Sequence, residues 1–547
     1  MLRSTALFPV LLWSAVLTAQ TAEAAPAVPE PPQALATIRK ADLLAHANWL
    51  ADGARAGRLT GSPEQEAAAA YIEAHFRKLG LEPLGDTDAD GARSFRQRYP
   101  IARTTLAPKS RLQFGDLSLE DGFALLGKQP GEHAVQGKLR FLGLGRTRGS
   151  QAELPADTTL DGDVAVVVAR APRGRLDRQL GVEQKFLMSF GTLGQIGRTA
   201  GNLAKKGAGA VVFLLLEDPV GLTDVLNYVA LSPGKDLVEA TFPGAQPVLG
   251  GLGALAGGEG GGSVPTCVLS IAASEKVLAV LGLDRAAVAA FVAGDGDLPP
   301  AKADLAAALT FAVTHEAQAS ACNVVAVLRG SDPQLAAEAV VYSAHMDHVG
   351  RRMDGAVFHG ADDNASGTAG LLAIASAFAG SAARPRRSVV FLSVSGEELG
   401  LWGSQFYADH PTWPIEQIVA NVNTDMIGRS GPESGPKEVG ATPSHERSEY
   451  TTLVRDAAGF AAKLGIELVS ADKYWDRSDH YNFAQKGIPV VFFCNGEHED
   501  YHQVTDTPDK LDGDKMERLA QLAFWTGWAV AADDERPRRL GRREGWR

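Results

Sequence analysis

The stretch from Val389 to Gly400 reads VVFLSVSGEELG, and its two halves indicate a fold and a site. The first half, VVFLSV, is a continuous apolar run, which is typical of a strand buried on both faces of a sheet. Similar runs occur at residues 340–343, 419–422 and 488–493, and helical patterns lie between them. This alternation predicts an α/β fold in which helices sandwich a mostly parallel mixed sheet.

Polar side chains follow each of these apolar runs. In an open α/β sheet, ligands bind beyond the carboxyl ends of the strands, so we expect these side chains at one edge. The segments are AHMDH (344–348), GADDNASG (360–367), SGEELG (395–400), NTDMIG (423–428) and GEHEDYH (496–502). Each alone could be a surface histidine, a helix cap or a solvated turn. Together, imidazoles and carboxylates without cysteine predict a site for zinc, manganese or cobalt.

Length and composition narrow the class of protein. A chain of 547 residues predicts two to three domains if one of them is a large α/β sheet. The net charge of −12 is opposite in sign to the positive charge that nucleic-acid-binding proteins use to contact phosphates. Three cysteines, Cys267, Cys322 and Cys494, are too few for a disulfide scaffold, and the sequence leaves their pairing open.

The first residues predict export. A positive start at Arg3 and a short apolar stretch precede Ala22-Glu23-Ala24, which has the small-x-small pattern of a cleavage site. Residues 1–24 are therefore expected to be a signal peptide, with an uncleaved anchor as the alternative. No later stretch approaches 18 uninterrupted apolar residues, so we expect no membrane span in the mature chain and a secreted or periplasmic protein.

The motifs AHMDHVG, GADDNASG, SGEELGLWGS, NTDMIG and YHQVTDTPD, in this order, resemble the M28 family of zinc aminopeptidases. The segment GRLTGS at 57–62 and the segment SDH at 478–480 are similar to that family as well. The resemblance implies a zinc-exopeptidase fold that comprises residues 34–130 and a metallopeptidase catalytic domain at 304–532.

Residues 131–300 resemble a smaller, β-rich protease-associated (PA) domain inserted in the peptidase fold. The resemblance rests on DGDV at 161–164 and NLAKKGAGAVV at 202–212, which is a diffuse pattern. Residues 533–547 form a basic tail with six arginines between 536 and 547, expected to be a solvated terminus.

The M28 resemblance implies a pair of zinc ions per chain, with cobalt or manganese as other possible metals. It implies these ligands: Asp363 as the bridge, His345 and Asp425 for one metal, Glu398 and His502 for the other. Asp362 is adjacent to Asp363, and the family's spacing to the following Ser366-Gly367 favours Asp363 as the bridge.

Three further residues are expected to act beside the metal ligands. Glu397 precedes a ligand, and its carboxylate is expected to face a metal-bridging water and to act as the general base. Asp347 lies two residues after His345 and can accept the second N–H of that imidazole. Tyr501 is the expected donor to the tetrahedral oxyanion.

The segment HEDYH at 498–502 matches the H-E-x-x-H zinc motif, which works only on a helix. It follows a strand and Asn495-Gly496 and has no apolar periodicity, so we predict a loop. His348, His359 and His480 are expected to be shell or surface histidines rather than ligands.

These features predict an exported aminopeptidase that removes N-terminal residues from peptides or small proteins. The alternatives are a carboxypeptidase, a glutaminyl-cyclase-like member of the same superfamily, a non-catalytic receptor-like relative or a zinc-binding adhesion module. Relatives without activity typically lose ligands, whereas here every expected ligand is present. The sequence leaves the side-chain preference and the oligomeric state open.

Overall fold

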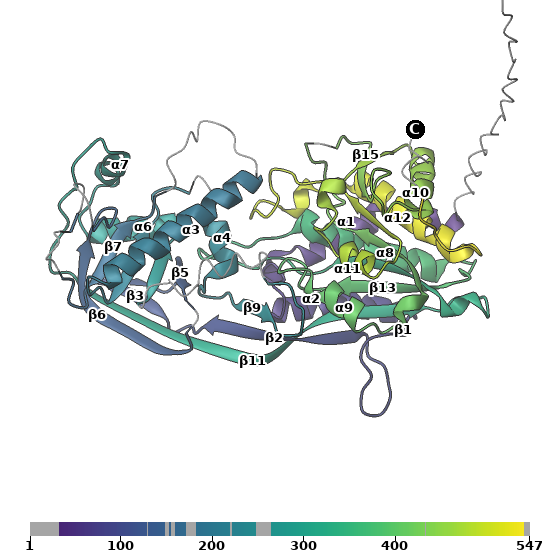
Figure 1. Cartoon of the computed structure of the whole chain (residues 1–547), viewed down its shortest axis with the longest axis horizontal. Helices are drawn as coiled ribbons and strands as arrows, with labels where there is room; N and C mark the ends of the chain where they lie inside the picture. The colour runs from purple at the N-terminus through teal and green to yellow at the C-terminus, as the bar shows by residue number, and fades with distance from the viewer. Residues whose placement is uncertain are drawn as a thin grey trace, which may run out of the picture.

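The structure, a computed structural model, describes residues 32–540 apart from 128, 148–152, 155–158, 171–181, 219–220, 248–263 and 433. Two lobes lie side by side and are joined along one side by long strands (Figure 1). The larger lobe carries the N-terminal helices and the C-terminal half of the chain. The predicted signal peptide, residues 1–24, lies outside the described residues.

A mixed sheet forms the centre of the larger lobe. Its four parallel strands lie in the order β13 (Ser388–Val394), β12 (Ala339–His345), β14 (Ile418–Thr424) and β17 (Val490–Cys494). Every residue in them is buried, as their continuous apolar runs predict. Antiparallel and outer strands complete the sheet: β11 (Ala306–Leu328) pairs with β13, β15 (Glu438–Thr442) with β17, and β16 (Glu467–Ser470) with β15.

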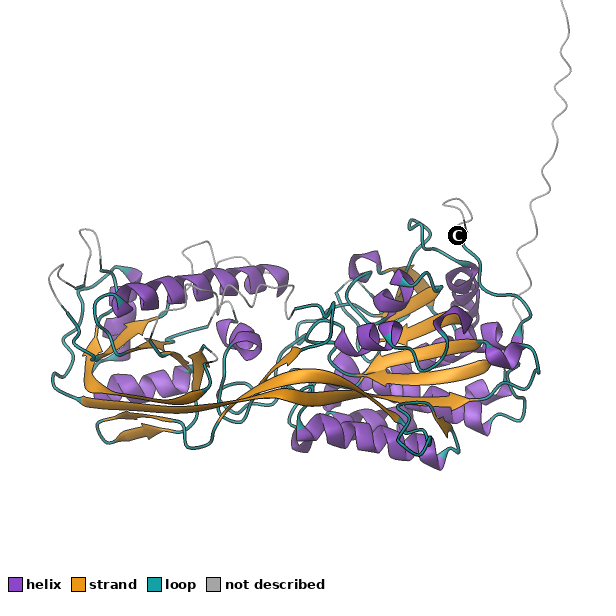
Figure 2. Cartoon of the chain, turned by 60° about the horizontal axis from the view of Figure 1, so that its bottom comes forward, coloured by secondary structure: helices purple, strands orange, loops and turns teal. Residues whose placement is uncertain are grey.

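Helices cover both faces of this sheet, which confirms the predicted fold class (Figure 2). The larger core lies on one face, under α1 (Lys40–Leu50), α2 (Pro63–Lys78), α8 (Gly367–Gly380), α10 (Thr452–Lys463) and α12 (Gly513–Ala532). The core on the other face includes Tyr407 of α9 (Trp402–Asp409) and Phe483 of α11 (His480–Gln485).

The smaller lobe has its own core and mixes strands with helices. Its parallel strands are β6 (Gly131–Phe141), β7 (Val164–Val168), β8 (Ala210–Leu214) and β10 (Thr266–Leu269), and β10 also pairs with the antiparallel strand β5 (Phe123–Leu126). The helices are α3 (Val182–Ala204), α4 (Leu222–Val229), α6 (Ile271–Val280) and α7 (Arg285–Ala293). A short hairpin, β3 (Arg111–Phe114) with β4 (Leu117–Leu119), packs on the same core.

Two long antiparallel strands connect the lobes. Strand β2 (Arg96–Leu106) pairs with β11 from Arg96 opposite Val324 to Leu106 opposite Val313, with a bulge near Glu316. The first part of β11 pairs with β6 and the last part with β13, so one strand belongs to both lobes (Figure 2). Between these parts, residues 314–318 are exposed and residues 321–323 are buried. These long strands were not predicted from the sequence.

The boundary of the smaller lobe differs from the sequence prediction. Residues 34–130 were expected to belong to the peptidase part, but Leu112, Phe114 and Phe123 share a core with Val164 and Val212. The smaller lobe therefore begins near residue 106, where β2 ends. The composition of the chain changes only after residue 130, whereas packing assigns the hairpin before it to the smaller lobe.

The start of the basic tail also differs from the expectation of a solvated terminus. Arg536 forms an ion pair with Glu338, with Nη2 and Oε1 2.6 Å apart, and Leu540 is buried. Residues 541–547 lie outside the described part of the chain. All three cysteines are buried and free. Among the described helices, none is both long and apolar enough to cross a bilayer.

The beginning of α2 is capped by a side chain. Ser62 is the N-cap, where its Oγ accepts a hydrogen bond from the backbone N–H of Gln65 at 3.2 Å, and Pro63 occupies the first helical position. This cap compensates for one of the backbone donors that the first turn of a helix leaves unpaired.

We expect Ser62→Ala to lower the free energy of unfolding by about 1 kcal/mol, because the N–H of Gln65 loses its acceptor. Denaturant unfolding of the whole chain measures this change. Ser62→Asp keeps an acceptor and serves as the matched control. Equal destabilisation by both substitutions would contradict the role of the cap.

Candidate metal centre

The predicted ligands gather at the carboxyl edge of the central strands. His345 is the last residue of β12, Glu398 follows β13 by four residues, and Asp425 directly follows β14. Asp363 lies in η5 (Ala361–Ser366), immediately before α8, and His502 lies in the loop after β17. Parallel strands end at one edge, which is why segments distant in sequence meet there.

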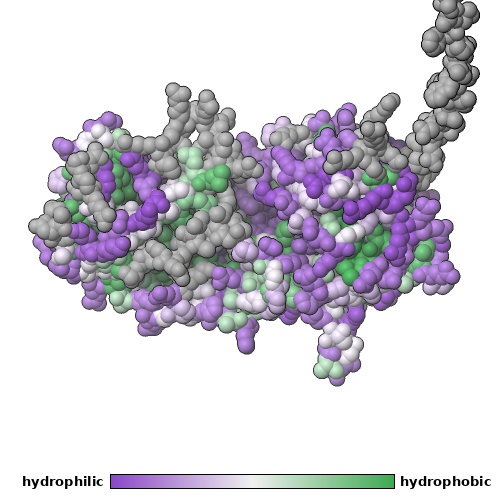
Figure 3. Space-filling view, viewed as in Figure 1, coloured by the Kyte–Doolittle hydropathy of each residue, from purple (hydrophilic) through white to green (hydrophobic). Residues whose placement is uncertain are grey.

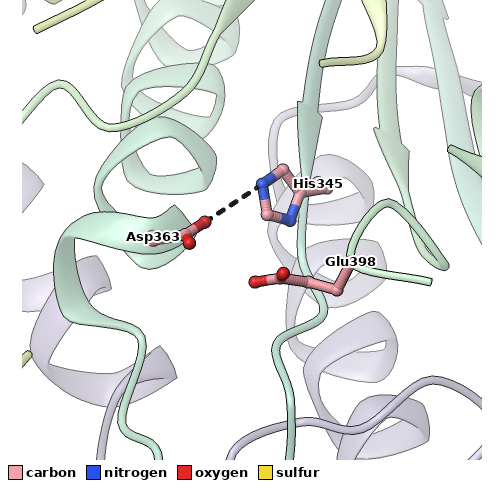
Figure 4. Close-up of side chains that lie close together, drawn as sticks. All are labelled: His345, Asp363 and Glu398. Atoms are coloured by element: carbon pink, nitrogen blue, oxygen red, sulfur yellow. Dashed lines mark ion pairs between the residues drawn. The ribbon is translucent and has the colours of Figure 1, made fainter. Parts of the chain in front are cut away.

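The carboxylate of Asp363 lies between two imidazoles. Its Oδ1 is 3.4 Å from Nε2 of His345, and its Oδ2 is 3.0 Å from Nε2 of His502. Figure 4 shows Asp363 pointing toward the ring of His345, with the carboxylate of Glu398 extending into the space beside them. The neighbouring Asp362 is turned away: its Oδ1 accepts a hydrogen bond from the N–H of Gly428 at 2.6 Å.

The other carboxylates divide between the two histidines. Nε2 of His345 is 3.3 Å from Oδ1 of Asp425 and 3.8 Å from Oε2 of Glu397. Nε2 of His502 is 2.9 Å from Oε2 of Glu398. The adjacent side chains of Glu397 and Glu398 thus face different imidazoles.

The donor atoms fit a metal site. Nε2 of His345 and Oδ1 of Asp425 are buried and lie 3.3 Å apart, but neither makes a well-directed hydrogen bond with any described residue. A buried polar atom without a partner costs about 1–3 kcal/mol, so such atoms are rare unless they serve a ligand. One ligand atom each from His345, Asp363 and Glu398 can lie within 4.8 Å of one another, and the same holds for His345, Glu397 and Asp425. Nitrogen and oxygen donors of this kind suit zinc, cobalt and manganese.

The electrostatic environment distinguishes the two adjacent glutamates. Burial raises the pKa of Glu397 well above its usual value, and the charges of Asp425 and Glu398 add to this effect while His345 opposes it. Burial also acts to raise the pKa of Glu398, but the imidazoles of His502 and His348 outweigh it and hold that pKa well below its usual value. The two carboxylates therefore differ in their affinity for a proton.

Several side chains contact the predicted ligands. His348 Nδ1 is 2.5 Å from Oε1 of Glu398, and the Oγ of Ser478 donates to Oδ2 of Asp425 at 2.9 Å. The Asp506 carboxylate accepts a hydrogen bond from the backbone N–H of Asp363 at 3.2 Å. His348 was predicted to be a shell or surface residue, and here it is a buried contact of a predicted ligand.

Asp347 lies beside His345, but the closer contact is made by its backbone. Nδ1 of His345 is 3.3 Å from the carbonyl oxygen of Asp347 and 3.7 Å from its Oδ1. The other carboxylate oxygen, Oδ2, accepts a hydrogen bond from Oγ1 of Thr60 at 2.8 Å. The N-terminal GRLTGS segment therefore reaches the site through Thr60.

Arg58 holds together the backbone around the site, a role that was not predicted from the sequence. Its buried guanidinium donates to the backbone carbonyls of Met346, Leu50, His359 and Gly360 at 2.7–2.9 Å. Burial lowers its pKa to about 10. These bonds hold the loop after His345 next to the segment that precedes Asp363. The only signal in the sequence was its place in GRLTGS.

The segment HEDYH is a loop, as predicted. No helix is assigned between residues 495 and 507, all of which the structure describes. His498 lies apart from His502, with its Nε2 3.3 Å from Oδ2 of Asp362. Two other histidines were also expected not to be ligands. Nδ1 of His359 lies 2.8 Å from the carbonyl oxygen of Ala51, and the ring of His480 stacks on that of Phe492.

A cavity of 1340 Å³ opens onto the site from between the two lobes. A recess between the lobes is visible on the face shown in Figure 3. Glu397, Glu398, Tyr501 and His502 line the cavity from the larger lobe, and residues of α4 line it from the smaller lobe. The ring of Tyr501 stacks on that of His502, with centroids 3.9 Å apart.

Comparison with known proteins agrees with this geometry. Residues 323–526 match peptidase family M28. A probable zinc metalloprotease of Pyricularia oryzae is 30% identical over 255 residues, which cover 38% of this chain and 49% of that protein. Aminopeptidase YwaD of Bacillus subtilis is 26% identical over 188 residues, which cover 33% of this chain and 40% of that one. The chain thus spans about half the length of the curated relatives it matches.

The fold is similar to that of solved structures. BSAP, a zinc aminopeptidase from Bacillus subtilis, superposes with a TM-score of 0.55 at 17% identity, covering 93% of this chain and 97% of that chain. This similarity extends over both lobes and confirms the α/β architecture. The match spans all five predicted ligands, so residues 323–526 are similar in sequence to peptidase family M28 over the segment that contains the candidate site.

Proposed function

We propose that this protein is a two-zinc aminopeptidase that acts on peptides or small proteins with a free N-terminus. One observation carries the proposal: Asp363 presents its two carboxylate oxygens to two different imidazoles. The relatives named as a zinc metalloprotease and an aminopeptidase support it. His345 and Asp425 would hold one zinc, Glu398 and His502 the other, and Asp363 would contact both. Cobalt or manganese could occupy the same donors.

Bound zinc would supply an activated water and polarise the carbonyl of the peptide bond to be cleaved. Glu397 is the general base. Glu397 lines the cavity, and its Oε2 is 3.8 Å from Nε2 of His345. Its raised pKa suits a carboxylate that accepts a proton. It takes the proton from the attacking water and delivers it to the leaving amine.

Tyr501 is proposed to donate a hydrogen bond to the oxyanion. It lines the cavity next to His502, and stacking on that imidazole limits the orientation of its ring. A donor held in place before the reaction stabilises the charge that develops on the carbonyl oxygen without reorganisation.

The charge of the cavity favours an amino end over a carboxyl end. Its basic lining residues are Arg352 and Arg477, whereas its acidic ones are more numerous: Asp218, Asp224, Glu275, Asp354, Glu397, Glu398, Asp476, Glu497 and Glu499. A terminal ammonium is attracted to this lining, and a terminal carboxylate is repelled by it. This difference favours an aminopeptidase over a carboxypeptidase.

The smaller lobe is proposed to be an inserted, PA-like domain that shapes the entrance to the site. It lies between segments of the peptidase sheet in the sequence, and it forms one wall of the cavity. Export through a cleavable signal peptide, to the periplasm or the outside of the cell, is proposed on the sequence of residues 1–24 alone.

We expect Glu397→Gln to lower kcat at least about a hundredfold while zinc content stays the same, because the site loses its proton acceptor but none of its ligands. Initial rates on the zinc-loaded protein measure the change. Glu467→Gln, at an exposed position on β16, is the control for a lost carboxylate. Unchanged turnover in Glu397→Gln would remove this residue from the mechanism.

The substrate class is tested with matched peptides that differ only in their termini. We expect hydrolysis of peptides with a free N-terminus and none of N-acetylated peptides, because the acidic cavity binds the ammonium group. Mass spectrometry of the products identifies the bond that is cleaved. Cleavage of a blocked peptide at its free carboxyl end would instead support the carboxypeptidase alternative.

Metal content tests the ligand assignment. After dialysis, elemental analysis is expected to find two zinc ions per wild-type chain and fewer than two in Asp363→Asn, because that variant loses the carboxylate whose two oxygens face the two imidazoles. Asp362→Asn changes the adjacent carboxylate, which faces Gly428, and is expected to retain both ions. If Asp362→Asn lost zinc and Asp363→Asn did not, the bridge would be wrongly assigned.

A further inference from the structure

Helix α4 of the smaller lobe docks against the loops that carry the metal centre. Nδ2 of Asn227 donates to the carbonyl of Val349 at 2.7 Å. Asp224, three residues earlier, forms an ion pair with Arg352, with Oδ1 and Nη1 3.6 Å apart. Residues three and four apart share a helix face, so Asp224, Asn227 and Tyr228 point toward the larger lobe together.

The third of these side chains reaches a proposed ligand. The hydroxyl of Tyr228 is 3.1 Å from Nδ1 of His502. The opposite ring nitrogen, Nε2, faces Asp363 and Glu398. The phenol also lines the cavity, so it lies on the boundary between the metal centre and the space for substrate.

His502 needs such a partner more than His345 does. His345 ends a strand, and its Nδ1 faces the carbonyl oxygen of Asp347 in its own loop. His502 lies in a loop with a left-handed φ of 54°, and its side chain is only partly buried. Among the described residues, the hydrogen-bond partner of Nδ1 of His502 is Tyr228, which belongs to the smaller lobe.

We infer that Tyr228 is a positioning residue for His502, so that the smaller lobe completes the metal centre. The inference rests on the proposed function. The phenol oxygen accepts the proton of Nδ1, which leaves the lone pair of Nε2 directed at Asp363 and Glu398. Outer partners of a ligating histidine fix its tautomer and ring orientation in this way. Zinc affinity at His502 is thereby linked to the docking of α4, and this linkage is reciprocal.

The test is zinc binding to the full chain, measured by titration against a chelator without any peptide. In Tyr228→Phe, which keeps the ring and removes the hydroxyl, we expect one of the two zinc ions to bind about tenfold more weakly. The same variant, at zinc concentrations that leave the weaker site partly filled, is expected to show a lower kcat with an unchanged KM.

The chain offers a matched control. The hydroxyl of Tyr71 lies 2.7 Å from Nδ1 of His46, between helices α2 and α1. Among the described contacts, neither side chain touches a proposed ligand. Tyr71→Phe removes the same chemical group from the same kind of pair and is expected to leave zinc affinity and kcat at the wild-type values.

Asn227→Ala separates docking from positioning, because it weakens the contact of α4 with the larger lobe and leaves the hydroxyl in place. A smaller loss of zinc affinity than in Tyr228→Phe supports the inference. Equal losses of zinc affinity in both variants would overturn the inference. Wild-type zinc affinity in Tyr228→Phe would overturn it too, even if that variant had a changed KM or a changed thermal stability. A wild-type chain that bound no zinc would instead refute the proposed function itself.

Discussion

The carboxylate of Asp363, facing imidazoles from two separate loops, is the contact on which the rest of the site depends. Removing several charged groups from water is costly, and the cost is offset only where their partners are held in good geometry. The structure provides this geometry through the backbone: Asp506 accepts the N–H of Asp363, and Arg58 joins the adjoining segments through their carbonyls. The position of the carboxylate is therefore a property of the whole edge of the sheet.

Two adjacent glutamates show how position in a turn separates chemical roles. Glu397 and Glu398 have the same side chain and neighbouring backbones, yet their pKa values shift in opposite directions. Burial acts on both in the same sense. The difference arises because two imidazoles, those of His348 and His502, face Glu398, whereas carboxylates surround Glu397 along with His345. One carboxylate is suited to remain charged and the other to accept a proton.

The two long strands explain how a second lobe comes to lie over the site. Because β2 and β11 pair along their length and each lobe takes one end of β11, the smaller lobe is fixed at one side of the peptidase sheet. Helix α4 then lies across the cavity from the candidate metal centre, close enough for Tyr228 to contact His502. A lobe that is distant in sequence from the ligand-bearing loops thus forms part of the wall of the cavity.

The sequence by itself determined the features that depend on local pattern. Apolar runs predicted the central strands, polar residues after each run predicted which edge carries the site, and the lack of periodicity in HEDYH predicted a loop. These properties follow from strand period and chain direction, which a short segment already contains. The tertiary structure decided what depends on distant pairing: the boundary near residue 106, the backbone clamp of Arg58, and the contact of Tyr228 with His502 across 274 positions. No local pattern encodes such contacts, because they arise only when separately formed elements pack together.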